Sequence, residues 1–137
     1  MFLGEFIHKL DSKNRIMMPS EFREDLEGTF YITKGPESSL ILLPEEEFIK
    51  KSQRLEEIGT SNKKSRAIKR LFFSSTVKTS LDKQGRILLN KNLKDYSGID
   101  SEAMIIGNNS TIEIWAIDKW QAYIDEVEVN LSDIMDE

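Results

Sequence analysis

The sequence predicts an α+β, β-rich fold in which one small unit occurs twice and the copies fold together as a single pseudo-two-fold domain. The first observation is a repeated phrase: residues 10–19 read LDSKNRIMMP and residues 81–90 read LDKQGRILLN. The likeness continues further along the chain, where ILLPEEEF at 41–48 aligns with EIWAIDKW at 113–120. The third observation is size, because half of a 137-residue chain is too short to bury a core alone.

The two copies align over more than the repeated phrase. Between residues 10–24 and 81–95, four positions are identical and several others keep their chemical character. The identical pairs are Leu10 and Leu81, Asp11 and Asp82, Arg15 and Arg86, and Ile16 and Ile87. A duplicated unit of this kind predicts two halves that bury each other's apolar faces. We divide the chain into residues 1–60, the first half with its helix, and residues 61–137, a basic helix, the second half, a C-terminal helix and an acidic tail.

Each half is predicted to begin with two short strands joined by a tight turn. FIHKL and RIMMP read as extended runs around residues 11–14, and STVKTSL and RILLN flank residues 82–85. Asn14 and Gly85 occupy the same place in the two turns. Glycine reaches a positive φ without steric cost, and asparagine tolerates it better than most residues. Both are therefore expected to organise their turns.

A short helix and a second pair of strands complete each half. Ser20 is expected to cap the helix EFREDLEG and Asn90 the helix KNLKDYSG, with Gly28 and Gly98 ending them. The strands that follow are TFYIT and SLILL in the first half, and AMIIG and TIEIW in the second. A polar turn containing glycine separates the strands of each pair.

Three longer helices flank the halves. Pro44 opens EEEFIKKSQRLEEI, residues 62–73 form a basic helix, and Asp118 caps KWQAYIDEVEV. Apolar residues at helical spacing predict one inward face on each helix. The residues expected on these faces are Phe48, Leu55, Ile58, Ile68, Leu71, Phe72, Trp120, Ile124 and Val127. The acidic tail, LSDIMDE, is expected to fray.

Composition excludes several classes of protein. There is no cysteine, so disulfides, thiolate metal sites and cysteine catalysis are absent, and a reducing cytoplasm is the expected location. The single histidine, His8, lies on an alternating strand segment where a surface or edge position is expected. No apolar run is long enough to cross a membrane, and no metal-binding or catalytic motif occurs. The sequence therefore predicts no enzyme, no cofactor and no small-molecule substrate.

Charge is distributed unevenly along the chain. The whole sequence carries −5, but residues 61–94 contain 10 basic and 1 acidic side chains, whereas residues 95–137 contain 1 basic and 11 acidic. A strongly basic segment suits an anionic partner such as nucleic acid. The alternative is that these lysines and arginines form only the solvated face of a helix.

The two turns are the candidate binding site. Each presents an aspartate, then a lysine, then an arginine, and the set comprises Asp11, Lys13, Arg15, Asp82, Lys83 and Arg86. The aspartate is expected to accept hydrogen bonds within the turn and to hold the arginine at a fixed angle. The planar fork of arginine then suits a phosphate or the O6/N7 edge of guanine, and the lysines suit phosphates. The alternative is an ion pair that only stabilises a hairpin.

Several stretches together resemble the MraZ family of bacterial proteins. They are MFLGEF, LDSKNRI, RAIKRLFFSST, LDKQGRILL and IIGNNSTIEIW, within residues 1–125. The resemblance implies two tandem AbrB-like, swapped-hairpin halves that form a double-psi-type barrel. It places the aspartate and arginine of both turns on the family motif. Asn14 stands where many relatives have glycine, and Asn90 stands where the first half has proline.

The resemblance also implies a function. A member of this family is expected to be a sequence-specific, DNA-binding transcriptional regulator associated with the nucleoid. It would recognise tandem repeats in double-stranded DNA upstream of the operon for cell division and cell-wall synthesis, through its paired Asp-x-x-x-Arg turns. MraZ-like proteins form ring-shaped homo-oligomers, commonly of eight subunits, and need no cofactor. The alternative is an AbrB-type antitoxin or interaction module whose main partner is a protein; such chains typically carry one unit and a long tail.

Overall fold

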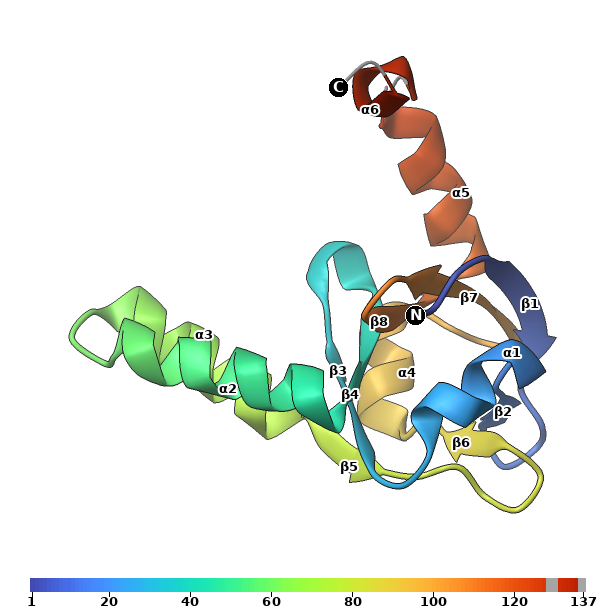
Figure 1. Ribbon diagram of the computed structural model, residues 1–137, viewed down its shortest axis with the longest axis horizontal. Helices are drawn as coiled ribbons and strands as arrows, with labels where there is room; N and C mark the ends of the chain where they lie inside the picture. Colours follow the sequence, from blue (N-terminus) through green and yellow to red (C-terminus); the bar gives the residue numbers. More distant parts are fainter. Residues whose placement is uncertain (128–130, 136–137) are drawn as a thin grey trace.

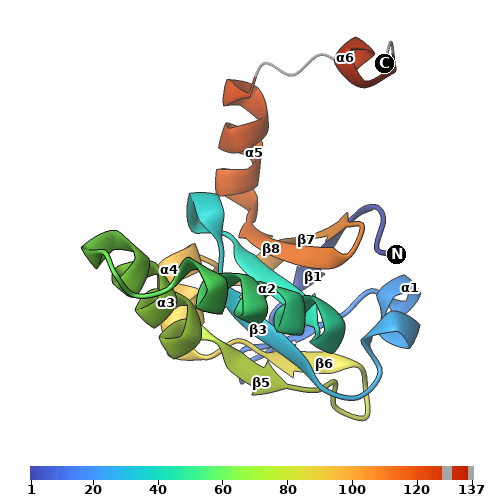
Figure 2. The same ribbon diagram turned by 60° about the vertical axis from the view of Figure 1, so that its left-hand side comes forward.

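The structure, a computed structural model, describes residues 1–127 and 131–135. A β-rich body carries two projecting arms (Figure 1). One arm is a helical hairpin of α2 (Glu45–Ile58) and α3 (Lys63–Ser75), and the other begins with α5 (Ile117–Glu126). The second view shows the same two arms leaving the body in different directions (Figure 2). Among the described residues, no helix is long and apolar enough to span a membrane.

The remaining elements follow the predicted order in both halves, and the α+β, β-rich class is confirmed. The strands are β1 (Glu5–Lys9), β2 (Arg15–Met17), β3 (Phe30–Lys34), β4 (Leu40–Pro44), β5 (Val77–Thr79), β6 (Arg86–Leu88), β7 (Glu102–Asn108) and β8 (Thr111–Ala116). The short helices are α1 (Ser20–Arg23), η1 (Glu24–Leu26), η2 (Pro36–Ser38), α4 (Lys91–Ser97) and α6 (Ser132–Met135). Each half therefore reads strand, strand, short helix, strand, strand, long helix.

The strand pairing exchanges the first strand of each half. The six-stranded sheet has the order β1-β7-β8-β4-β3-β5, and β2 pairs with β6 in a second sheet. β1, from the first half, pairs with β7 of the second, and β5, from the second half, pairs with β3 of the first. Each half thus completes its sheet with a strand from the other, which confirms the duplicated, swapped-hairpin arrangement. A half on its own would leave unpaired strand edges.

Equivalent residues of the two halves meet on the pseudo-two-fold axis. Ile16 pairs with Ile87 at the centre of β2 and β6, and Ile41 pairs with Glu113 between β4 and β8. Both of these pairs of equivalent strands are antiparallel, as a two-fold relation between neighbouring strands requires. The N–H of Met18 also donates to the turn of the second half, and the N–H of its counterpart donates to the turn of the first. The two turns therefore share one backbone framework.

The core is built from both halves at once. Its buried residues include Ile16, Met18, Phe22, Leu26, Phe30, Ile32, Leu40 and Leu42 from the first half, and Ile87, Leu89, Leu93, Ile99, Ile105, Ile112 and Ile114 from the second. Phe22 is 1% exposed and meets the rings of Phe2 and Phe6 edge-to-face, each with centroids 5.3 Å apart. His8 lies on β1, which is an edge strand of the six-stranded sheet, as predicted.

Some predicted helix ends are right and others are wrong. Asn90 caps α4 through a hydrogen bond from the third residue along, and Gly98 ends that helix with a φ of 72°. Ser20 and Asp118 are not caps: α1 begins at Ser20 itself, Asp118 lies in the first turn of α5, and neither makes a capping hydrogen bond. Both helices begin earlier than expected, because the residue before them already supplies the extended N-cap backbone. Gly28 has a positive φ of 75° but lies beyond the end of η1.

The inward faces predicted for the arms are only partly correct. Phe48 stacks on Tyr31 of the sheet with ring centroids 3.9 Å apart, so the base of the hairpin is packed. Several residues predicted to face inward are instead exposed. Their exposed fractions are 51% for Ile58, 44% for Ile68, 66% for Leu71 and 49% for Ile124. Helical spacing identified an apolar stripe on each arm, but both arms project from the body (Figure 1), and in the part of the chain that the structure describes these stripes remain partly exposed. The predicted fraying of the tail falls partly on residues 136–137, which lie outside the described residues; residues 132–135 form α6.

Candidate nucleic-acid interface

Asp11 organises the first turn. Its Oδ1 accepts hydrogen bonds from the backbone N–H groups of Lys13 and Arg15, each at 2.9 Å, and its Oδ2 accepts one from Nε of Arg15 at 2.8 Å. The N–H of Asn14 donates to the carbonyl of Asp11, and Asn14 has a φ of 61°. One carboxylate therefore fixes both the backbone of the turn and the direction of the arginine side chain.

The second turn repeats this pattern at its equivalent positions. Oδ1 of Asp82 accepts the N–H groups of Gln84 and Arg86 at 3.0 and 2.8 Å, and Oδ2 accepts Nε of Arg86 at 2.8 Å. Gly85 takes the place of the asparagine and has a φ of 82°. The hydrogen bonds expected of the two aspartates are thus present in both copies. Their contribution to a nucleic-acid site stays a prediction.

The two turns also contact each other. Nη1 of Arg86 lies 3.5 Å from Oδ2 of Asp11, so the arginine of the second turn reaches the carboxylate of the first. The pairing of β2 with β6 brings the turns together, and Figure 1 shows both at the opposite end of the molecule from the tip of the α2–α3 arm. Lys13 and Lys83 are exposed beside them. The structure therefore brings the two predicted turns into contact, with their lysines exposed.

Each turn is supported by a basic side chain from the other half, which the sequence analysis did not predict as part of the site. Nζ of Lys94, on α4, donates to Oδ1 of Asn14 at 2.7 Å. The side chain of Arg23, on α1, lies against Gly85; a Cβ added to Gly85 would be 2.6 Å from Nε of Arg23. Arg23 and Lys94 occupy equivalent positions in the aligned halves. That shared positive charge in the alignment is the signal that could have found them.

These supports explain why the turns differ at one position. At the first turn the side chain of Asn14 accepts a hydrogen bond from Lys94. At the second turn the side chain of Arg23 occupies the space where a side chain on Gly85 would lie. Gly85 suits this position because its φ is positive and because the absence of a side chain leaves room for Arg23.

The turn aspartates are held in their charged form. The backbone N–H of Arg15 is the main cause that lowers the pKa of the Asp11 carboxyl, and the N–H of Arg86 does the same for the pKa of Asp82; the arginine side chains add to both effects. Near neutral pH each turn therefore contains an ionised carboxylate that can hold its arginine. Partial exposure of the groups screens these interactions.

The lowered pKa values predict how stability depends on pH. The stabilisation that the two ionised aspartates provide is complete above the ordinary aspartate pKa of about 3.9. Between that pKa and the lowered pKa values of the folded turns, only the unfolded chain takes up protons, so the stabilisation is lost as the pH falls through this range. We expect the double variant Asp11→Asn, Asp82→Asn to lose stability less steeply with falling pH than the parent chain. Urea unfolding from pH 6 down to about pH 2 measures this. Parallel curves would contradict it.

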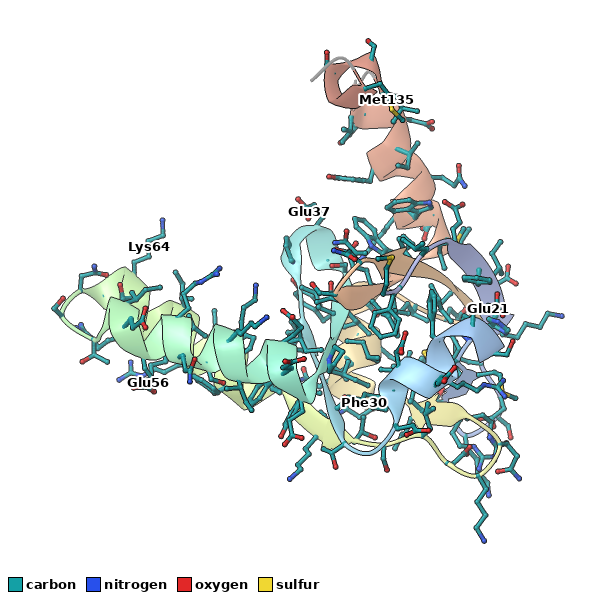
Figure 3. The ribbon with its side chains drawn as sticks, in the orientation of Figure 1. Glu21, Phe30, Glu37, Glu56, Lys64 and Met135 are labelled. Atoms are coloured by element: carbon teal, nitrogen blue, oxygen red, sulfur yellow. The ribbon has the colours of Figure 1, made fainter. Side chains whose placement is uncertain are left out.

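The basic helix contributes to a different surface. α3 leaves the body with α2, and Lys64 lies near the tip of that arm (Figure 3). Lys69 pairs with Glu56 of α2 at 2.8 Å, and Arg66 donates to the carbonyl of Thr60 at 2.9 Å. Part of the basic charge of the middle segment therefore holds the hairpin together, away from the two turns. Within residues 1–127 and 131–135, no cluster of acidic or histidine side chains could hold a metal ion.

Comparison with known proteins now decides the family. A family model described as "MraZ protein, putative antitoxin-like" matches the chain twice, over residues 1–71 and 72–137. The chain belongs to the MraZ family. The two matches agree with the duplication, and the family model covers both Asp-x-x-x-Arg turns, one in each MraZ repeat. The division into residues 1–60 and 61–137 stays a prediction.

Several proteins named MraZ are similar to this chain over most of its length. A protein of Finegoldia magna is 39% identical over 136 residues, covering 99% of this chain and 95% of its own length. A protein of Clostridium tetani is 44% identical over 125 residues, covering 91% and 88%. A protein of Desulforamulus reducens is 37% identical over 134 residues, covering 98% and 94%. Each of these relatives is named transcriptional regulator MraZ.

Proposed function

We propose that this chain is a transcriptional regulator that binds double-stranded DNA through its paired turns. The observation that carries the proposal is the pair of aspartate-fixed arginines, Arg15 and Arg86, held side by side at Asp11 with exposed lysines beside them. Arginine forks of fixed direction suit base edges in the major groove, and Lys13 and Lys83 suit phosphates. The names of the relatives support regulation of transcription. A regulator of this kind acts in the cytoplasm, on the nucleoid.

The target that this proposal names is a set of tandem repeats upstream of the division and cell-wall operon. One copy of the chain offers few phosphate contacts, which is too little for tight binding at physiological salt. A ring-shaped homo-oligomer, which we propose to be an octamer, would present several pairs of turns to several repeats and gain affinity from multivalency. The exposed apolar residues of the two arms support self-association. So does the opposite net charge of α3 and α5: α3 carries Lys63, Lys64, Arg66, Lys69 and Arg70, whereas α5 carries Asp118, Asp125 and Glu126 against one lysine, Lys119.

A second candidate function is binding to a protein partner, as an antitoxin or interaction module. The observation that favours it is the exposed apolar surface of α3, where Ile68 and Leu71 line a groove of about 720 Å³ with Phe72 and Tyr96. Capture of a protein from the native host in a stoichiometric complex with this chain, together with no preference for any DNA sequence, would favour this second function over DNA binding.

A salt titration tests the proposed function. Fluorescence anisotropy compares a labelled duplex from directly upstream of the chain's own gene with a shuffled duplex of equal length. We expect tight binding to the first duplex alone, with log affinity falling steeply as log salt rises. Sedimentation of the same samples reports the number of subunits bound. Equal and weak binding to both duplexes would contradict the proposal.

A further inference from the structure

The two turns are not equivalent, although their backbones are. In the second turn all three guanidinium nitrogens of Arg86 have an acceptor: Nε contacts Asp82 at 2.8 Å, Nη1 contacts Asp11 at 3.5 Å and Nη2 contacts Gln84 at 3.3 Å. Its side chain is 22% exposed. Because each of its three guanidinium nitrogens already donates a hydrogen bond to a protein oxygen, Arg86 has fewer free N–H groups to donate to a base edge.

Arg15 is in a different position. Only its Nε has a side-chain acceptor among the described residues, the carboxylate of Asp11 at 2.8 Å, and its side chain is 32% exposed. The residue that corresponds to Gln84 is Lys13, which has no acceptor oxygen to offer the fork. No described residue therefore occupies the two terminal nitrogens of Arg15, which are the pair that makes a bidentate contact with guanine.

The geometry points to a division of labour that rests on the proposed function: Arg15 is the specificity-determining residue that reads a base, and Arg86 is a positioning residue that locks the two turns together. Arg86 acts through Asp11, because its Nη1 and Nε of Arg15 meet the same carboxylate oxygen. The ligand of Arg15 is the guanine edge of a base pair in the major groove. Lys13 and Lys83 add sequence-independent contacts to phosphates on either side.

Substituting lysine for arginine separates these roles, because lysine keeps the charge but loses the planar fork. The variants Arg15→Lys and Arg86→Lys are compared in the full-length chain. The readout is the specificity ratio, the affinity for the duplex upstream of the chain's own gene divided by that for the shuffled duplex. For Arg15→Lys we expect this ratio to fall roughly 5- to 150-fold, the discrimination of one bidentate contact, with little change in the salt slope. For Arg86→Lys we expect less than a roughly 3-fold fall in the ratio, since no direct readout is lost.

Thermal unfolding and sedimentation of both variants keep the comparison interpretable. Equal melting temperatures and oligomer sizes mean that a difference in the ratio comes from readout and not from folding. Equal losses in both variants would overturn the division of labour and leave the proposed function standing. A loss in Arg86→Lys alone would also overturn it. If neither variant changes the ratio while the parent chain prefers its own duplex, the turns do not read DNA and both proposals fail.

Discussion

Replacing Asp11 with alanine is expected to abolish preferential DNA binding, and to do so more completely than replacing Asp82. Asp11 accepts two backbone N–H groups of its own turn, Nε of Arg15 and, more distantly, Nη1 of Arg86. Its loss therefore frees one turn and removes a support of the other. Since one bidentate contact discriminates roughly 5- to 150-fold, and Arg15 loses the carboxylate that fixes its direction, the affinity for the native duplex should fall by about the upper part of that range.

Asp82→Ala is the matched comparison for this variant. Asp82 supports its own turn in the same way, but of the two turn arginines it contacts only Arg86 among the described residues. We expect the affinity of Asp82→Ala to fall clearly less than that of Asp11→Ala, measured by anisotropy on the same duplex and at the same salt. The oligomer size should be unchanged in both, because the turns lie away from the arms. A larger loss from Asp82→Ala would show that the first carboxylate does not join the two turns.

Replacing Phe22 with alanine is expected to have the largest effect on stability. Phe22 is 1% exposed and packs edge-to-face against Phe2 and Phe6, so its removal leaves a cavity where α1 meets the N-terminal strand. Deleting a buried phenylalanine side chain costs about 3–5 kcal/mol, which is a large fraction of the stability of a small domain. The free energy of unfolding in urea measures this, at one fixed protein concentration because self-association adds to apparent stability.

An exposed residue from the same region provides the control. Leu3 follows Phe2 in the chain but is 63% exposed, so Leu3→Ala should change the free energy of unfolding by less than about 0.5 kcal/mol. If Phe22→Ala costs no more than Leu3→Ala, the packing of α1 against the first strand is not what holds this end of the body.

The sequence determined the local pieces of this protein and their duplication. Local chemistry decides a tight turn, and the Asp-x-x-x-Arg phrase with a residue suited to positive φ at its fourth position was enough to predict both turns and the carboxylate that organises each. Asn90 and Gly98 bounded α4 for the same reason, since a cap acts on the backbone within a few residues. The family resemblance supplied the exchange of strands, which local patterns do not encode.

Only the tertiary structure decided what the pieces contact. Arg86 reaches Asp11, Lys94 reaches Asn14 and Arg23 covers Gly85 across about half the chain, so no spacing in the sequence predicts these contacts. The same limit applies to the arms: Ile68 and Leu71 have the spacing of a buried stripe, but whether a stripe is covered depends on what lies opposite it in space. The difference between Arg15 and Arg86 arises in the same way, because two equal phrases were placed among unequal neighbours.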